Sequence, residues 1–275
     1  MGNDIKIIAM IGGGYMGKAI TAKASDYGYT VRLYDIKLEG LDKLAKRLNK
    51  QKQKKEIPGE ITIHESISEA VADADLVIEA VPERLELKKE IFSQIDKAAP
   101  PHAIIATNSS SIPVSKIEGA VERKDKVLNI HFYSVMLHPM ADIMRGSITS
   151  DETFEKGKKW IESIEFFPLV VKKECLGFVF NRVWRAVKKE CLKIWAEGNA
   201  DIEIVDKAWQ LWTGMGFGPF KAMDGVGLDV VYDIEMSYYN ESGDPKDKPP
   251  QALKDMVDRG ELGMKTGQGF YPIKK

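Results

Sequence analysis

The chain has 275 residues, and its 40 basic residues nearly balance its 41 acidic ones. This length accommodates two domains of about 150 residues each, and the charge balance gives no reason to expect a nucleic acid or an anionic membrane as a partner. Cys175 and Cys191 are the two cysteines and lack metal-ligand spacing, and no run of about eighteen apolar residues occurs. We therefore expect a soluble cytoplasmic protein with reduced thiols, without a membrane span and without a metal site.

A glycine-rich turn follows the first predicted strand. Residues 5–11 form a nearly continuous apolar run, which is typical of a strand buried on both faces. Gly12, Gly14 and Gly17 then fit the pattern G-x-G-x-x-G, in which the glycines allow a tight turn, close approach of backbone to a pyrophosphate, and close packing of helix on strand. The alternative is a glycine turn that binds no ligand.

The next residues favour a ligand site at this turn. A helix is expected over 19–27 and a second strand over 29–34, and this strand leads directly to Asp35. In a dinucleotide-binding unit, a carboxylate at this place accepts hydrogen bonds from the adenosine ribose. The combination predicts a Rossmann unit that binds NAD rather than NADP.

Strands and helices alternate as far as Lys172. The alternation predicts an α/β domain over residues 1–172. The lysines of residues 49–55 are expected on a solvated helix end, with a landing site for phosphates as the alternative. The further strands are expected over 61–63, 76–78, 103–106, 127–132 and 169–171, and the helices over 38–55, 67–72, 85–99 and 153–164.

Beyond Lys172 the pattern predicts helices alone, over 177–196, 201–211, 227–239 and 250–257. The first of these carries a broad apolar stripe from Phe178 to Trp195, which suits a buried or partner-facing helix. We therefore expect a separate all-α domain over residues 173–275.

His131 is the candidate for acid–base chemistry. An enzyme that oxidises an alcohol with a nicotinamide cofactor needs a base for the hydroxyl proton, and histidine is the commonest choice. His131 ends a predicted strand, at the edge where open α/β sheets bind their ligands. Asp142 is well placed to hydrogen-bond the imidazole and stabilise its protonated form, although the residues alone leave a purely structural His–Asp pair equally open. The remaining histidines are expected at the surface: His64, His102 and His138.

Several motifs, in this order, resemble the L-3-hydroxyacyl-CoA dehydrogenase family over almost the whole chain. The resemblance implies a dinucleotide-binding domain followed by a helical domain that forms a homodimer. It also implies NAD-dependent oxidation of an L-3-hydroxyacyl-CoA to the 3-oxoacyl-CoA, a reaction of fatty acid metabolism. The matching stretches are residues 11–17 (IGGGYMG), 75–83 (DLVIEAVPE) with 87–89, 107–111 (TNSSS), 131–132 (HF), 177–182 (GFVFNR), 225–229 (GVGLD) and 263–271 (GMKTGQGFY).

The resemblance also implies roles for single residues. His131 matches the catalytic histidine that takes the hydroxyl proton, and Ser110 matches the serine that hydrogen-bonds the same oxygen. Asn181 resembles the asparagine that completes the site from the second domain, and Asp142 is the candidate partner of His131. The residues implied around NAD are Gly12, Gly14, Tyr15, Met16, Gly17, Asp35, Glu83, Lys88, Asn108 and Lys265.

Two departures from the family concern the acyl-CoA side. Ser134-Val135 replace an asparagine and a proline, and Asp142 takes the place of the family glutamate after one deletion, which would make it reach His131 from a shortened loop. The segment Asp35–Glu79 looks shorter than in relatives, whose helical hairpin there helps to cover coenzyme A. The alternatives are therefore a dehydrogenase of a 3-hydroxy acid without CoA and a catalytically silent NAD-binding protein.

Overall fold

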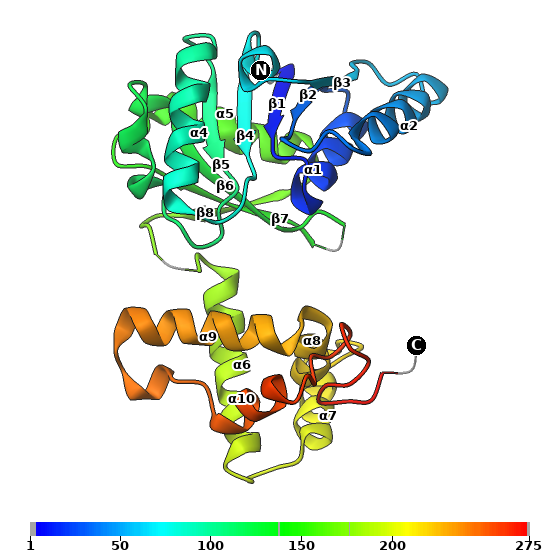
Figure 1. The fold of residues 1–275 in the computed structure, drawn as a ribbon, viewed down its shortest axis with the longest axis vertical. Coiled ribbons are helices and arrows are strands. Elements are labelled where there is room, and N and C mark those ends of the chain that lie inside the picture. The colour runs from blue at the N-terminus through cyan, green and yellow to red at the C-terminus, as the bar shows by residue number, and fades with distance from the viewer. Residues whose placement is uncertain (1–3, 137, 176, 274–275) are drawn as a thin grey trace. The chain divides into compact units, whose positions relative to one another are not determined.

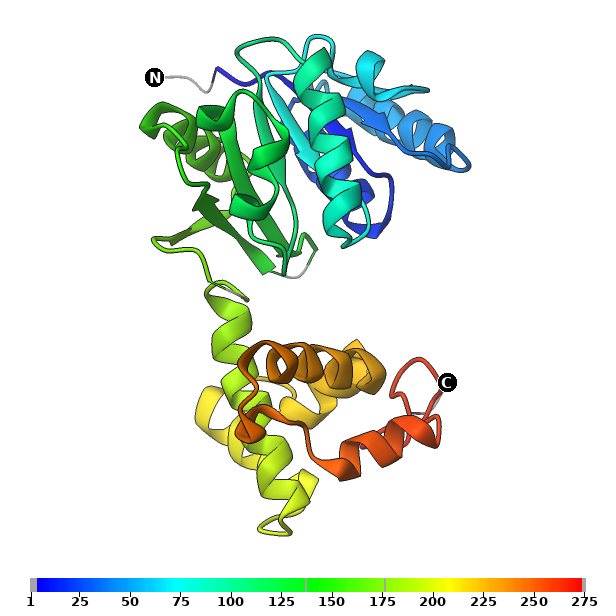
Figure 2. The ribbon, with the colours of Figure 1, turned by 60° about the vertical axis from the view of Figure 1, so that its left-hand side comes forward.

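The structure is a computed structural model that describes residues 4–136, 138–175 and 177–273. The chain forms two compact units, Met1–Val179 and Phe180–Lys275. The first unit contains the whole β-sheet and the second is helical (Figure 1, Figure 2). No helix in the described part of the chain is long and apolar enough to cross a membrane.

An eight-stranded sheet organises the first unit, with the order β3-β2-β1-β4-β5-β6-β7-β8. Neighbouring strands are parallel except for β6 and β7, which are antiparallel. The strand order reverses between β1 and β4, and such a switch point creates the crevice where open α/β sheets bind ligands. The strands are β1 (Ile7–Ile11), β2 (Thr30–Tyr34), β3 (Ile61–His64), β4 (Leu76–Glu79), β5 (Ile104–Thr107), β6 (Val127–Ser134), β7 (His138–Arg145) and β8 (Phe167–Val171).

Helices cover both faces of this sheet, so its central strands are apolar on both sides. Ile8 and Met10 of β1 pack into one hydrophobic cluster with α1, α2 and α5, whereas Ala9 and Ile11 pack into a second cluster with α3 and α4. This alternation is the two-residue period of a strand. The helices are α1 (Tyr15–Asp26), α2 (Leu41–Lys54), α3 (Ile67–Val71), α4 (Leu85–Ala98) and α5 (Asp151–Ser163), with short 3-10 turns η1 (Val114–Lys116), η2 (Glu118–Ala120) and η3 (Lys124–Lys126).

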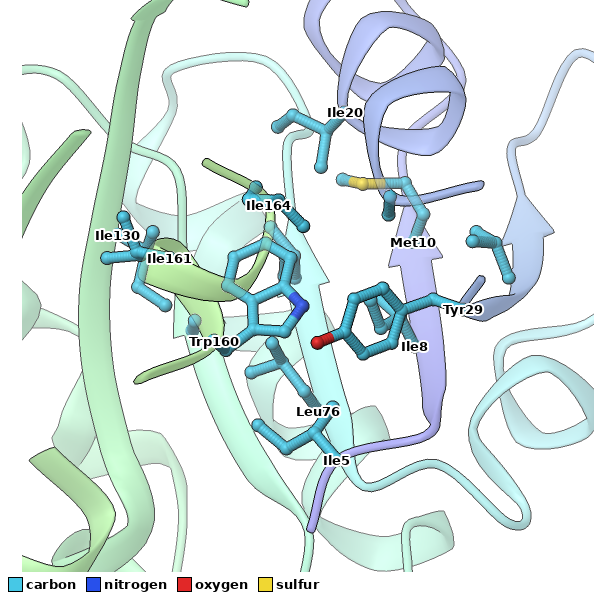
Figure 3. Close-up of a cluster of buried hydrophobic side chains, with 14 of the residues drawn as sticks. Ile5, Ile8, Met10, Ile20, Tyr29, Leu76, Ile130, Trp160, Ile161 and Ile164 are labelled. Carbon is cyan, nitrogen blue, oxygen red and sulfur yellow. The ribbon is translucent and has the colours of Figure 1, made fainter. Parts of the chain in front are cut away.

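The largest buried side chain of the first cluster is Trp160 of α5. Its indole lies in the sheet–helix layer with Ile8 and Leu76 (Figure 3). Phe132 of β6 meets the indole edge to face, with 6.0 Å between ring centroids. Because Phe132 directly follows His131, this packing fixes the end of the strand that carries the candidate base.

Two expectations for this unit are wrong. Asp142 was expected to reach His131 from a shortened loop, but residues 138–145 form the additional strand β7, which carries Asp142 and pairs with β6. Lys52 was expected on a solvated helix end, but it is 3% exposed and its Nζ donates to the carbonyl oxygen of Ser25 at 2.6 Å. Burial lowers the pKa of Lys52, and its ammonium neutralises the negative C-terminal end of α1.

The helical unit has its own core. Cys191 and Leu192 of α6 pack there with residues of α8, α9 and α10 and with Phe270. Burial raises the pKa of the Cys191 thiol to about 11, so this cysteine is an unreactive core residue. The helices are α6 (Phe180–Ala196), α7 (Ile202–Thr213), α8 (Pro219–Val226), α9 (Leu228–Ser242) and α10 (Gln251–Asp258), with the 3-10 turn η4 (Pro245–Asp247). The sequence did not predict α8.

Candidate active site

The glycine loop between β1 and α1 is tightly packed at two glycines and open at the third. A Cβ on Gly12 would lie 2.6 Å from the backbone oxygen of Ala80, and a Cβ on Gly17 would lie 1.8 Å from the oxygen of Gly12. A Cβ on Gly14 would meet no atom within 4 Å. Gly12 and Gly17 are therefore required for packing, whereas Gly14 borders open space.

That open space lies at the N-terminus of α1. Gly14 is the N-cap residue and has no side chain to cap the first turn, which also lacks acidic residues. The uncapped N–H groups and the helix dipole suit a pyrophosphate, so the loop fits NAD. Tyr15, at the start of α1, is 75% exposed, whereas Met16 packs partly against the sheet core.

Asp35 follows β2 and lies against the same loop. Its Oδ2 accepts a hydrogen bond from the backbone N–H of Gly13 at 2.6 Å, and its Oδ1 accepts one from the N–H of Lys37 at 2.7 Å. These bonds hold a carboxylate beside the glycine turn. An acid in this place suits the ribose hydroxyls of an adenosine.

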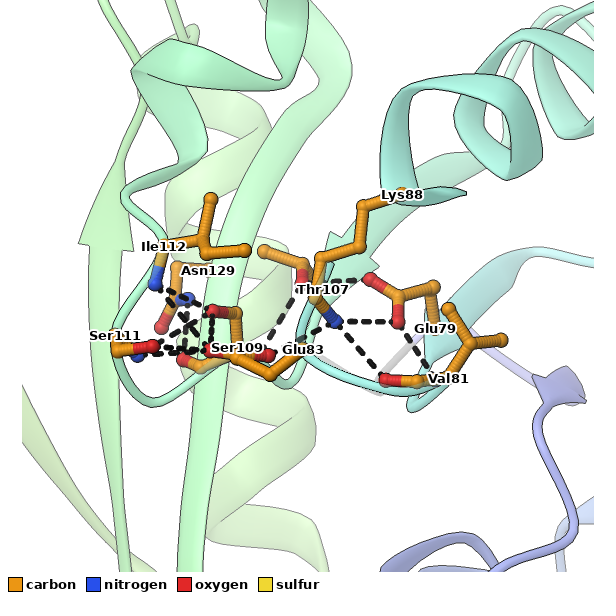
Figure 4. Close-up of polar contacts among 9 residues, drawn as sticks. All are labelled: Glu79, Val81, Glu83, Lys88, Thr107, Ser109, Ser111, Ile112 and Asn129. Carbon is orange, nitrogen blue, oxygen red and sulfur yellow. Dashed lines mark hydrogen bonds and ion pairs between the residues drawn. The ribbon is translucent and has the colours of Figure 1, made fainter. Parts of the chain in front are cut away.

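A buried charge network follows β4 (Figure 4). Lys88 of α4 is 1% exposed, and its Nζ lies 2.7 Å from Glu79 Oε1, 3.2 Å from the carbonyl oxygen of Val81 and 3.2 Å from Glu83 Oε2. These contacts occupy the three N–H donors of the ammonium. Thr107 donates to the other oxygen of Glu79 at 2.8 Å. Lys88 therefore fixes the loop between β4 and α4 from within the protein.

Glu83 carries this network to the loop after β5. Ser109 and Ser111 donate their hydroxyl protons to Glu83 Oε1, as Figure 4 shows. Burial acts to raise the pKa of Glu83, but the hydrogen bond from Ser109, the charge of Lys88 and the bonds from Ser111 outweigh it and lower the pKa to about 2. The carboxylate is therefore ionised throughout the neutral range and holds the serine loop in place.

The serine loop lies next to the strand that carries His131. Asn108 Oδ1 accepts a hydrogen bond from the backbone N–H of Phe132 at 3.0 Å, and the carbonyl oxygen of Ser109 accepts one from Asn129 Nδ2 at 3.0 Å. Ser110 directly follows these two anchored residues and is exposed. Of these residues, Ser109 and Asn129 were not singled out from the sequence, where only the motif TNSSS pointed to the loop.

His131 and Asp142 are opposite each other in the antiparallel pair β6–β7. His131 Nδ1 lies 3.2 Å from Asp142 Oδ2, and the exposed fractions of the two residues are 5% and 0%. Asp142 thus reaches the imidazole from the neighbouring strand and not from a shortened loop. Since the carboxylate accepts the proton of Nδ1, Nε2 is the nitrogen that can exchange a proton with a ligand.

Two aromatic rings enclose this pair. Tyr133 contacts His131 edge to face, with 4.6 Å between the ring centroids, and its hydroxyl also donates to Asp142 Oδ2. Phe178 packs on His131 with a centroid distance of 5.3 Å. Phe178 adopts a left-handed backbone conformation (φ 52°) that is unusual for a bulky residue. The sequence did not single out Tyr133 or Phe178 as site residues.

The other predicted site residues belong to the helical unit. Asn181 lies in the first turn of α6 and is half-buried. Lys265 forms an ion pair with Asp229, with 2.8 Å between Nζ and Oδ1. The remaining histidines lie outside the His131 cluster: His102 and His138 are exposed, and the half-buried His64 ends β3.

Comparison with known proteins connects both units to one family. Residues 7–175 match the family model described as "3-hydroxyacyl-CoA dehydrogenase, NAD binding domain", and residues 177–273 match "3-hydroxyacyl-CoA dehydrogenase, C-terminal domain". A probable 3-hydroxybutyryl-CoA dehydrogenase of Bacillus subtilis is 34% identical, and the match covers 99% of each chain.

Two solved structures are similar over almost the whole chain. The (S)-3-hydroxybutyryl-CoA dehydrogenase of Ralstonia eutropha has a TM-score of 0.87 and 31% identity, covering 99% of this chain and 100% of that one. A diketoreductase, whose structure is described in terms of dual catalysis of dicarbonyl compounds, has a TM-score of 0.85 and 33% identity, covering 98% of this chain and 99% of that one.

Proposed function

Because the chain belongs to the 3-hydroxyacyl-CoA dehydrogenase family and is an NAD-dependent oxidoreductase, we propose that it oxidises a short-chain L-3-hydroxyacyl-CoA with His131 as general base. The observation that carries this proposal is the pair of His131 and Asp142. It is buried in the sheet, one strand away from the serine loop. A His–carboxylate pair at the ligand-binding side of an open α/β sheet suits proton abstraction from an alcohol.

In the proposed reaction His131 Nε2 takes the proton of the 3-hydroxyl group. The bond from Nδ1 to Asp142 keeps the imidazole in the required tautomer and stabilises its protonated form. By the family resemblance, Ser110 donates a hydrogen bond to the same substrate oxygen and Asn181 belongs to the catalytic residues. Bound NAD supplies the hydride acceptor.

NAD would be held mainly by the first unit. The open space at Gly14 and the uncapped turn of α1 suit the pyrophosphate, and Tyr15 and Met16 belong to the same turn. Asp35 suits the adenosine ribose. Glu83 and Asn108 are assigned to the nicotinamide end together with Lys265, and Lys88 acts through Glu83 because it is itself buried.

The CoA moiety and the assembly belong to the proposal as well. The names of the relatives from Bacillus subtilis and Ralstonia eutropha support an acyl-CoA substrate. Exposed apolar side chains on the helical unit, among them Leu211 and Trp212, support a homodimer through that unit. We further assign the enzyme to fatty acid metabolism in the cytoplasm.

A second candidate is the same oxidation on a 3-hydroxy acid or related carbonyl compound without CoA. The similarity to the diketoreductase favours it. The segment between Asp35 and Glu79, which the resemblance associates with covering CoA, contains the single long helix α2 (Leu41–Lys54). Competition between free CoA and substrate separates the two candidates, since only a CoA-binding enzyme is inhibited.

The test is NADH formation from purified protein with L-3-hydroxybutyryl-CoA, its D-isomer and free L-3-hydroxybutyrate. We expect turnover of the L-CoA ester alone. His131→Ala should lower kcat by about a hundredfold or more, while the affinity for NAD stays nearly unchanged. Equal turnover of the free acid would favour the second candidate, and full activity of His131→Ala would contradict the assigned base.

A further inference from the structure

The carboxylate of Asp142 holds two hydrogen-bond donors on one oxygen. Its Oδ2 accepts from His131 Nδ1 and from the hydroxyl of Tyr133. Its Oδ1 is buried and has no hydrogen-bond partner among the described residues. A fully buried charge is costly unless it is hydrogen-bonded, so the tyrosine hydroxyl is one of the two groups that keep this carboxylate in place.

The strand places Tyr133 at this oxygen. Residues two apart on a strand share a face, and the register between β6 and β7 shifts between Phe132 and Ser134. Despite this shift Tyr133 lies on the His131 side of the sheet, because its ring packs edge to face on the imidazole at an interplanar angle of 72°. The same side chain thus touches both members of the pair.

We propose that Tyr133 is a positioning residue, which holds Asp142 toward His131 and stabilises the negative charge of the carboxylate through the hydrogen bond from its hydroxyl. This inference rests on the proposed function, because it concerns the base of that reaction. The hydrogen bond from the Tyr133 hydroxyl to Asp142 is strongest when His131 is neutral, because no imidazolium charge then compensates the carboxylate. Tyr133 therefore favours the neutral imidazole, which is the form that accepts the substrate proton.

The pH dependence of His131 reflects the titratable and polar groups that surround its imidazole. On β6 the titratable neighbour is Tyr133, and on β7 it is Asp142. From the segment after β8, Phe178 covers the imidazole, and Cys175 Sγ lies 3.7 Å from the carbonyl oxygen of Phe178. From the β5 side the neutral amide of Asn108 accepts a hydrogen bond from the N–H of Phe132, the residue next to His131.

The test compares the pH profile of kcat/KM in the wild type, Tyr133→Phe, Asp142→Asn and the double variant. Tyr133→Phe keeps the ring and removes the hydroxyl. We expect it to move the pH midpoint of oxidation upward by about half a unit or more and to lower kcat by about tenfold. Asp142→Asn should move the midpoint downward, because it removes the anion that stabilises the imidazolium.

Coupling and specificity are tested in the same series. In the Asp142→Asn background, Tyr133→Phe should cause little further shift, because the tyrosine acts through the carboxylate. Tyr27→Phe is the matched control, since Tyr27 ends α1 and its hydroxyl donates to the carboxylate of Glu165, outside the His131 cluster. This variant should leave the midpoint unchanged. An unchanged midpoint in Tyr133→Phe, or equal shifts in both backgrounds, would overturn the proposal.

An NMR titration of the His131 imidazole in the absence of substrate separates this inference from the proposed function. If the wild type does not turn over hydroxyacyl-CoA but Tyr133→Phe raises the imidazole titration midpoint, the proposed function fails and the hydrogen-bond chain stands. If the wild type turns over and the titration midpoint does not move, the positioning role of Tyr133 fails alone.

Discussion

Alanine substitutions at Gly14 and Gly17 separate the binding role of the glycine loop from its packing role. The structure gives opposite expectations for the two positions. A Cβ on Gly17 would lie 1.8 Å from the backbone oxygen of Gly12, whereas real Cβ atoms stay at least 3.0 Å from such neighbours. Helix α1 would have to move away from β1 by about 1 Å or more, and this displacement would disturb the core that contains Ile20 and Ala24.

The expected cost of Gly17→Ala is about 3 kcal/mol, at the upper end for overpacking. For a chain of this size it corresponds to a fall in the melting temperature of about 6 °C or more. Gly14→Ala should change the free energy of unfolding by less than about 1 kcal/mol. Alanine restricts the unfolded chain and so stabilises the fold, but it is a poorer N-cap residue than glycine, and the two effects partly cancel. The backbone of Gly14 (φ −69°) is open to alanine.

The affinity for NAD should change in the opposite order. The methyl group of Gly14→Ala occupies the space where backbone approaches the pyrophosphate, so we expect the Kd for NADH to rise by about tenfold or more. Circular dichroism melts and NADH fluorescence titrations measure the two quantities on the same samples. Unchanged NADH affinity of Gly14→Ala would refute the placement of the pyrophosphate, and an unchanged melting temperature of Gly17→Ala would refute the packing argument.

Three further predictions concern the cofactor, acid stability and assembly. Asp35→Ala should weaken NAD binding and narrow the preference over NADP, because the carboxylate repels the extra phosphate of NADP; comparable kcat/KM for both cofactors in the wild type would contradict this. Because the pKa of Glu83 is lowered to about 2 from an ordinary value of 4.5, its contribution to stability is present above pH 4.5 and is lost as the pH falls toward 2. Acid unfolding of Glu83→Gln, followed by fluorescence, should therefore show a weaker pH dependence in that window, and parallel curves would argue against it. Light scattering at micromolar concentration should give the mass of a dimer, and Trp212→Glu, which places a charge on a side chain that is 90% exposed, should shift it toward the monomer; a wild type of monomer mass would rule out the homodimer.

The sequence by itself determined the Rossmann unit and the helical unit that follows it. An apolar run, glycines at fixed spacing and a carboxylate after the second strand are local signals, because strand and helix periods are read along the chain. His131 could be singled out in the same way, since the end of a strand is visible in the pattern. The motifs of the 3-hydroxyacyl-CoA dehydrogenase family then predicted the remaining site residues.

Only the tertiary structure decided which side chains meet. Asp142 was expected to reach His131 from a shortened loop, yet pairing with β6 makes its segment the strand β7 and puts the carboxylate opposite His131. The same strand pairing brings the hydroxyl of Tyr133 to Asp142. The family resemblance places Lys88 around NAD, but only the folded chain shows that oxygens of Glu79, Val81 and Glu83 surround its ammonium. Such contacts depend on the register between strands and on the approach of distant segments, which hydrophobic periodicity along the chain does not specify.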